Sequence, residues 1–259
     1  MPFERDDGTP LEAIALAQRP AAADRFELRE AIVYVDPLTG RRYRAPAAGE
    51  APLPHGVTDL ASVPSPLWGL IASYGRQSAP AILHDERSRV AAELGDRRAA
   101  LAQRREDDRV FHTGLREQGV PRLRARLMWA WVSADREREF GGVLGWVLLG
   151  QVGAGVLLAV AAVVLAVVAG PWWLLLALVP LAAALAWGRL APLVLVLTFS
   201  LAGFGPLLLL QLAALVAFRA VEAVVELVSG GDPASVVRPT IAVPRPGAVP
   251  RPGEEDPRG

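Results

Sequence analysis

The stretch VLGWVLLGQVGAGVLLAVAAVVLAVV, residues 143–168, decides how this chain has to fold. It contains no charged residue, and the whole block from 143 to 218 contains only one, Arg189. About 20 apolar residues in a helix are enough to cross the hydrocarbon core of a bilayer. A soluble core does not need 76 residues with a single charge, so we expect residues 143–218 to form an α-helical transmembrane bundle.

Turn residues divide this block into three expected spans. Gly170-Pro171 breaks the helix after the first span, and Gly188-Arg189 separates the second from the third. The second span is near the lower length limit for crossing a bilayer. The three expected spans are approximately residues 143–168, 172–187 and 190–218.

The distribution of arginine predicts the orientation. Arginines are frequent just before the first span, and Arg189 falls on the same side of the expected bundle. The positive-inside rule then places the N-terminal domain in the cytoplasm and the C-terminal tail outside. If the second span is re-entrant, the tail returns to the cytoplasm. The arginines preceding the first span are Arg122, Arg124, Arg126, Arg136 and Arg138.

Composition excludes several functions. The net charge is zero, which argues against a nucleic-acid partner. There is no cysteine, so disulfides, thiolate catalysis and thiolate zinc sites are excluded. The N-terminus is charged and lacks the apolar core of a signal peptide. None of the spans carries a carboxylate, histidine or lysine of the kind that transporters use, which favours an anchor.

The residues before the membrane block read as a soluble α+β domain, residues 25–140. A small β hairpin is expected around a turn at Asp36–Gly40. Three helices should follow. Ser78 caps the first and Gly119 ends the second. Residues 1–24 are expected to be a flexible N-terminus, and residues 229–259, rich in Pro, Arg and Gly, a disordered tail. The expected helices are residues 78–94, 97–118 and 121–140.

Two polar residues lie on helix faces that should be buried. Asp108 shares an apolar stripe with Leu101, Phe111 and Leu115, and His84 shares a face with small residues. If the two helices form an antiparallel hairpin, His84 can face Asp108. Such a pair either joins the helices structurally or forms a catalytic or metal site. A metal ion would use His84, Asp85 and Asp108, with Asp59 as a further ligand.

At this point the chain resembles a known family, the bacteriophage-associated domain of unknown function numbered 1353. That family typically shows T-D-G-A-S-x-P, then an H-D pair, then an A-D-R-x-F helix, and the resemblance covers roughly residues 25–135. The chain departs from the pattern at Leu60, at Glu86-Arg87-Ser88 and at Asp107. The matching positions are Thr58, Asp59, Ala61, Ser62, Pro64, Trp68, His84, Asp85, Asp108, Arg109 and Phe111.

The resemblance implies a phage or phage-tail setting without an assigned activity. Joined to a cytoplasm-facing membrane anchor, it suggests an adaptor that docks a phage-tail-like contractile injection system on the cytoplasmic membrane. The partner would be a baseplate protein, and several copies of the chain could assemble as a homo-oligomer. This hypothesis needs no cofactor and favours a binding protein over an enzyme.

Two other functions remain open. An H-D pair facing an Asp on the next helix resembles secreted phospholipase A2. By that resemblance His84 would be the base, Asp85 would hold calcium or another divalent metal, and Asp108 would orient the His. The chain lacks the disulfides and the glycine-rich calcium loop of those enzymes. A holin-like, membrane-perturbing effector is the third possibility, although the spans show no clear amphipathic pore-lining face.

Overall fold

The computed structural model describes residues 2–18, 26–52, 55–60, 72, 74–233 and 236 of the 259-residue chain. The fold is α+β, with two small antiparallel sheets followed by helices. The chain forms two compact units, and the described residues of the first end at Val120. The motif positions Ala61, Ser62, Pro64 and Trp68 lie outside the described residues, as does the expected tail from residue 237 onward.

The first sheet of the N-terminal unit contains the expected hairpin. Strands β4 (Ile32–Val35) and β5 (Arg42–Ala45) pair antiparallel, with Tyr34 opposite Tyr43. The turn between them is closed by the amide of Gly40, which donates to the carbonyl of Asp36. Strand β1 (Phe3–Glu4) pairs with the other edge of β4 and completes the order β1-β4-β5.

The second sheet was not expected. Its order is β2-β3-β6, formed by Leu16–Gln18, Phe26–Leu28 and Val57–Thr58. The segment 26–35 is therefore divided between two sheets by a bend at Arg29-Glu30. Residues 3–4 and 16–18 also belong to the sheets. The start of the chain is held because the Phe3 side chain is fully buried.

Two helices complete the N-terminal unit, α1 (Ser78–Ala92) and α2 (Arg97–Glu117). Asp96 caps α2 by accepting the amides of Arg98 and Ala99, a cap that the sequence analysis treated as a plain turn. Ser78 is the first residue of α1 and not its cap, because its hydroxyl accepts the Gly75 amide.

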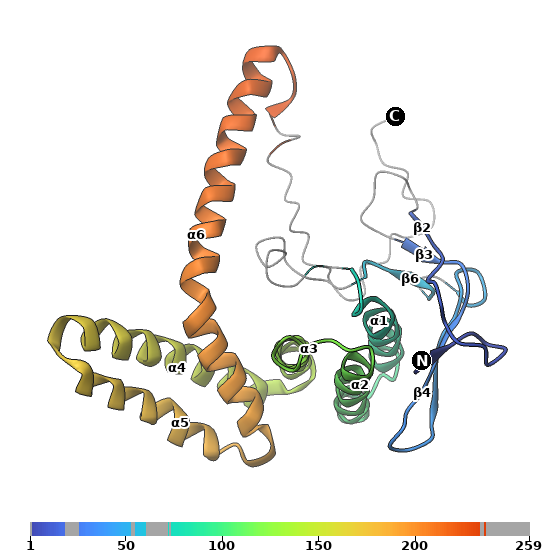
Figure 1. The fold of residues 1–259 in the computed structure, drawn as a ribbon, viewed down its shortest axis with the longest axis horizontal. Coiled ribbons are helices and arrows are strands. Elements are labelled where there is room, and N and C mark those ends of the chain that lie inside the picture. The colour runs from blue at the N-terminus through green and yellow to red at the C-terminus, as the bar shows by residue number, and fades with distance from the viewer. Residues whose placement is uncertain are drawn as a thin grey trace. The chain divides into compact units, whose positions relative to one another are not determined.

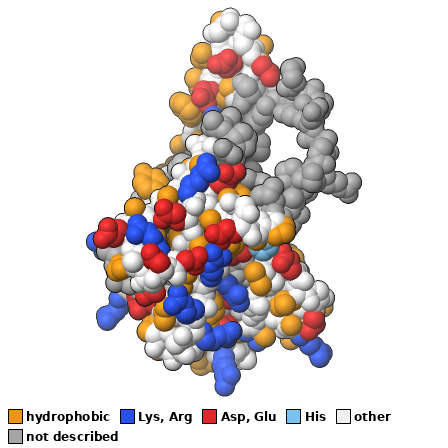
Figure 2. Space-filling view, turned by 90° about the vertical axis from the view of Figure 1, so that its right-hand side faces the viewer, with side chains coloured by type: hydrophobic (Ala, Val, Ile, Leu, Met, Phe, Trp, Pro, Cys, Tyr) orange, Lys and Arg blue, Asp and Glu red, His pale blue; other side chains and the backbone are white. Residues whose placement is uncertain are grey.

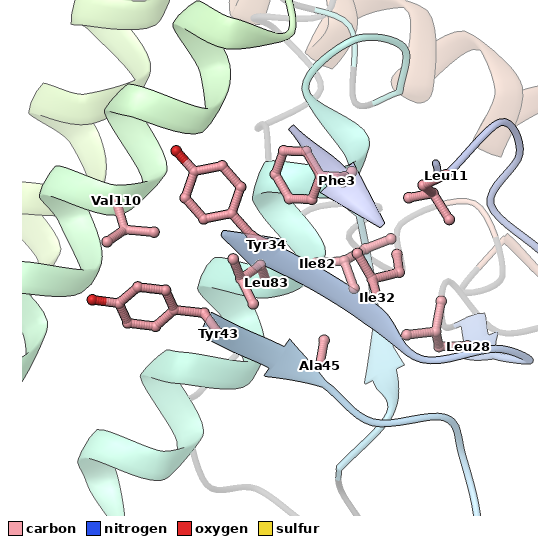
Figure 3. Close-up of a cluster of buried hydrophobic side chains, with 11 residues drawn as sticks. Phe3, Leu11, Leu28, Ile32, Tyr34, Tyr43, Ala45, Ile82, Leu83 and Val110 are labelled. Carbon is pink, nitrogen blue, oxygen red and sulfur yellow. The ribbon is translucent and has the colours of Figure 1, made fainter. Parts of the chain in front are cut away.

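A cluster of buried side chains joins the strands to these helices (Figure 3). The rings of Tyr34 and Tyr43 lie beside each other on β4 and β5, and their hydroxyl groups point toward α2. Each hydroxyl donates to a glutamate of that helix, Tyr34 to Glu117 at 2.5 Å and Tyr43 to Glu106 at 3.1 Å. The cluster contains Phe3, Leu11, Leu28, Ile32, Tyr34, Tyr43, Ala45, Ala79, Ile82, Leu83 and Val110.

The second unit is helical. Helix α3 (Arg122–Phe140) belongs to it. The reason is packing, because Ala130 of α3 is buried in one cluster with Leu148 of α4 and Leu193 of α6. The remaining elements are α4 (Gly142–Ala169), η2 (Pro171–Ala177), α5 (Leu178–Leu185), η3 (Gly188–Leu190) and α6 (Ala191–Ser229).

Helix α4 and the segment η2–α5 run antiparallel as a hairpin (Figure 1). At Gly155 of α4 the neighbours come so close that an added Cβ would lie 2.9 Å from Thr198 Cγ2. The indole of Trp187, which follows α5, donates to Gln151 Oε1 of α4 at 2.8 Å and so links the two arms of this hairpin.

The structure differs from the expected three spans. Two segments, Gly142–Ala169 and Gly188–Ser229, are long and apolar enough to cross a membrane. The segment between them, Pro171–Leu185, is shorter and begins as a 3-10 helix. The third expected span continues as one α-helix through Pro206 and past residue 218 to Ser229.

The conformation of Leu60 generates a prediction. Its φ of +66° lies in the left-handed region, where a Cβ costs about 1 kcal/mol. Leu60 also packs against the buried cluster, so both Leu60→Ala and Leu60→Gly lose those contacts. Only the glycine variant relieves the backbone, and we expect it to be about 1 kcal/mol more stable than the alanine variant. Thermal unfolding of the two purified full-length variants measures the difference, and a more stable alanine variant would contradict it.

Candidate functional site between helices α1 and α2

His84 and Asp108 meet between the two helices of the N-terminal unit. The His84 Nε2 atom lies 2.9 Å from Asp108 Oδ1, and the two side chains are 8% and 0% exposed. If Asp108 is ionised, its carboxylate can only accept, and this contact then requires a proton on Nε2. Phe111 packs against the imidazole, with the ring centroids 4.9 Å apart. The helical spacing that suggested this pair therefore corresponds to a real contact.

Two polar residues lie beside the pair, Ser88 and Arg104, and the sequence analysis did not predict a contact for either. The Arg104 guanidinium lies 3.3 Å from His84 Nε2 and donates to the Ser88 hydroxyl. The Ser88 hydroxyl donates to the backbone carbonyl of His84 at 2.6 Å. Arg104 is one turn before Asp108 on α2, so helical spacing from Asp108 is the signal that could have identified it.

Asp107, beside Asp108, forms a separate contact with α1. Arg87 Nε donates to Asp107 Oδ1 at 3.0 Å, and the carboxylate is fully buried. Burial raises the pKa of Asp107, whereas the charge and hydrogen bond of Arg87 lower it. Its second oxygen, Oδ2, has no hydrogen-bond partner among the described residues. Arg87 and Asp107 are both positions at which the chain differs from the motif pattern of the family that it resembles.

Asp85 is directed to another part of the domain. The Thr58 hydroxyl donates to Asp85 Oδ2 at 2.7 Å and itself accepts the Leu60 amide at 2.9 Å. Burial, followed by the nearby charge of Asp59, raises the pKa of Asp85 to about 7, although Arg89 opposes the shift. Thr58 of the T-D motif thus ties the loop after β6 to helix α1.

The residues considered as metal ligands form two separate groups. Asp108 is bound to His84, whereas Asp85 is bound to Thr58 and lies near the charge of Asp59. Within the part of the chain that the structure describes, no group of three or more His, Asp or Glu side chains could hold a metal ion.

Arg109 of the D-R-x-F motif has a structural role. Its guanidinium binds both oxygens of Asp36, at 2.7 and 3.3 Å, and also contacts Glu106. The Arg109 hydrogen bonds lower the pKa of Asp36 to about 2 despite its burial, and Thr39 adds a further hydrogen bond. Arg109 therefore fastens α2 to the β4–β5 turn.

A second histidine lies in a charged cluster that sequence spacing did not predict. His55 Nδ1 is 2.6 Å from Glu86 Oε1, and its Nε2 is 3.1 Å from Glu93 Oε1. Burial lowers the pKa of His55, but the two glutamates overcome this and raise it. His55 precedes β6 on a loop, more than 30 residues from Glu86, so local periodicity carries no signal of the contact.

Opposite charges are interspersed on the surface that Figure 2 presents, where acidic and basic side chains alternate without a large block of either sign. Among the described residues, Arg44 pairs with Asp6 at 2.5 Å and with Glu50 at 2.6 Å.

Comparison with known proteins gives one match. The model of a family described as a protein of unknown function (DUF1353) matches residues 38–132. The match includes β5, β6, α1, α2 and the first part of α3, and so contains both His84 and Asp108. No curated protein and no solved structure matches the chain. The comparison supports a domain of unknown function in this part of the chain.

The raised pKa of Asp85 predicts a pH dependence of stability. An acid whose pKa is about 7 when folded and 3.8 when unfolded holds its proton more tightly in the folded chain. Stability from this group is therefore present below about pH 4 and is lost as the pH rises to about 7. Asp85→Asn keeps an oxygen for Thr58 and removes the titration. We expect the variant to gain about 2 kcal/mol relative to the parent between pH 5 and pH 8.

Thermal unfolding midpoints of both proteins across this range give the comparison. The difference in unfolding midpoint between variant and parent is compared, because the raised pKa of His55 adds its own pH dependence of stability equally to both proteins. A difference that stays constant from pH 5 to pH 8 would show that Asp85 does not titrate there.

Proposed function

We propose that this chain is a membrane-anchored adaptor, in which α4 and α6 hold the N-terminal α+β unit at a membrane. The observation that carries the proposal is the uncovered apolar surface of these helices. In the most apolar part of each candidate span, only 22% of the residues are buried. In a soluble protein, most apolar residues of a core helix are covered by other parts of the chain. The exposed apolar surface of α4 and α6 is therefore better suited to the interior of a bilayer than to water.

The uncovered surface is extensive along α6. The first turns of this helix are buried against α4 and α5, but large apolar side chains from residue 207 onward are exposed. At about 1.5 Å per residue, the apolar stretch 190–218 is about 43 Å long, enough to cross the hydrocarbon core with tilt. The exposed residues include Leu207, Leu209, Leu210, Val216, Phe218, Val221, Val224 and Val228.

The adaptor role rests on the N-terminal unit. Its conspicuous polar residues hold the domain together, since His84, Asp108 and Arg109 all bind partners within it. This supports a rigid binding module over an open catalytic cleft. The resemblance to a phage-associated family favours a baseplate protein of a phage-tail-like contractile injection system as the partner. Arginine placement favours a cytoplasmic location for the module.

Anchoring can be tested by placing charge on the exposed face of α4. Leu157→Arg with Val164→Arg changes two exposed apolar residues near the middle of the helix. Each arginine should cost about 3 kcal/mol in a bilayer, so the variant should be lost from the carbonate-resistant membrane fraction. Leu38→Arg, at an exposed leucine of the β4–β5 turn, is the matched control and should remain. Parent protein that is fully extracted by carbonate would contradict anchoring.

Partner binding is measured by affinity purification of the tagged full-length chain from gently solubilised membranes, followed by mass spectrometry. We expect baseplate components to be recovered, and to be lost when residues 1–120 are deleted. Purifications from cells that contain such particles, but that yield no tail protein, would overturn the docking role and leave the anchor in place.

One observation favours a hydrolase as the second candidate. His84 is bonded to Asp108 and is followed by Asp85, the order of groups in the phospholipase A2 arrangement. A calcium-dependent lipase assay on the full chain distinguishes the two functions. Under the adaptor proposal we expect no turnover, and a loss of about 3 kcal/mol of stability in His84→Ala because the buried Asp108 carboxylate loses its hydrogen bond with His84. Calcium-dependent turnover that His84→Ala abolishes would establish the hydrolase.

A further inference from the structure

Helix α3 combines basic and apolar groups on exposed positions. Arg122, Arg124 and Arg126 are exposed, and no acidic residue occurs in the helix before Asp135. Leu123 and Trp131, which lie two turns apart on the same side of the helix, are 66% and 42% exposed. A helix with arginines and exposed Leu and Trp has the composition of segments that bind the surface of a bilayer.

The arginines at the start of α3 lack acidic partners. Among the described residues, Arg122, Arg124 and Arg126 form no ion pair, and Arg126 stacks over the Trp129 ring with its guanidinium 4.7 Å from the centroid. The arginines at the other end are neutralised locally, Arg138 by Asp135 at 2.6 Å and Arg136 by the adjacent glutamate. The basic charge of the first turns is therefore available to an outside anion.

The corner between α3 and α4 fixes the direction of α3. Only Gly141 lies between the two helices, and Gly142 has a φ of +61° that turns the chain. The backbones touch there, because a Cβ at Gly145 of α4 would lie within 2.0 Å of the Glu137 carbonyl oxygen. Figure 1 shows α3 end-on while α4 lies across the view, so the two helices cross steeply. If α4 crosses a bilayer, α3 lies along its surface.

We propose that α3 is an interfacial helix that lies in the plane of the membrane and binds anionic lipid headgroups through Arg122, Arg124 and Arg126. The inference rests on the proposed anchoring by α4 and α6, and adds a lipid preference to it. Leu123 and Trp131 would enter the boundary between headgroups and acyl chains, where Trp is favoured. The occupant is the bilayer surface, because α3 continues directly into a helix that is long and apolar enough to span.

The absence of cysteine makes the test direct, since a single introduced thiol carries the only label. Leu123→Cys and Trp131→Cys are spin-labelled in the full-length protein, which is reconstituted into vesicles of phosphatidylcholine with or without phosphatidylglycerol. Collision rates with oxygen, which concentrates in lipid, and with a water-soluble nickel chelate report the depth of each label. We expect both labels to be lipid-exposed, and more so in the anionic vesicles.

Two further labels separate this inference from the anchoring on which it rests. Leu157→Cys lies on the exposed side of α4, near the middle of the helix, and should report the bilayer interior. Leu38→Cys is the matched control for Leu123→Cys, because both leucines are strongly exposed and Leu38 lies on the β4–β5 turn. Leu38→Cys should report water in both kinds of vesicle. A lipid-exposed label at 157 with aqueous labels at 123 and 131 would overturn the interfacial helix alone, whereas an aqueous label at 157 would overturn the anchoring.

The arginines are tested together in Arg122→Gln with Arg124→Gln and Arg126→Gln, made in the Trp131→Cys background. Each arginine near an anionic surface contributes about fivefold to the bound population. The variant should therefore lose the difference between anionic and neutral vesicles. The same three substitutions made separately in the Leu157→Cys background should leave the depth of that label unchanged. An unchanged response to phosphatidylglycerol would show that these arginines do not bind lipid headgroups.

Discussion

Asp108 is fully buried, and the N-terminal unit is arranged so that this carboxylate and its two neighbours in sequence each find a partner. Asp107 binds Arg87 and Asp108 binds His84, both on α1, while Arg109 binds Asp36 at the end of β4. A buried carboxylate without a partner costs several kcal/mol, so these contacts restrict how α2 can pack. Three consecutive residues of one helix thereby fix its position against a second helix and against a strand.

The same constraint explains why the chain can depart from the family pattern that it resembles. Arg87 and Asp107 are both departures, and they contact each other. Ser88 is another, and it accepts a hydrogen bond from Arg104. The polar groups at these positions thus form hydrogen bonds with partners inside the same unit. Leu60 is different, because it stands where that pattern has glycine and adopts a left-handed backbone conformation that glycine occupies without strain.

The second unit follows from an apolar surface that no described part of the chain covers. Its helices pack closely where small residues permit, as at Gly155 and Gly145, and leave large apolar side chains outside. A bilayer would cover that surface, and the corner at Gly142 would then direct α3 along the membrane face. Under these proposals, the arginine-rich first turns of α3 and the apolar helices that follow would both contact lipid.

The sequence by itself determined the elements with local causes. Apolar runs without charge identified α4 and α6. The turn at Asp36–Gly40 predicted the β4–β5 hairpin, and Gly95 and Gly119, which follow the ends of α1 and α2, helped to locate these two helices to within a few residues. Helical periodicity also brought His84 and Asp108 onto facing surfaces. Only the tertiary structure decided which partners the polar groups take and to which unit α3 belongs. Some features depend on contacts between residues far apart in sequence: the strands β1, β2 and β6, the His55 cluster and the packing of Ala130. Sequence periodicity could not predict them, because it indicates only which face of an element a residue lies on.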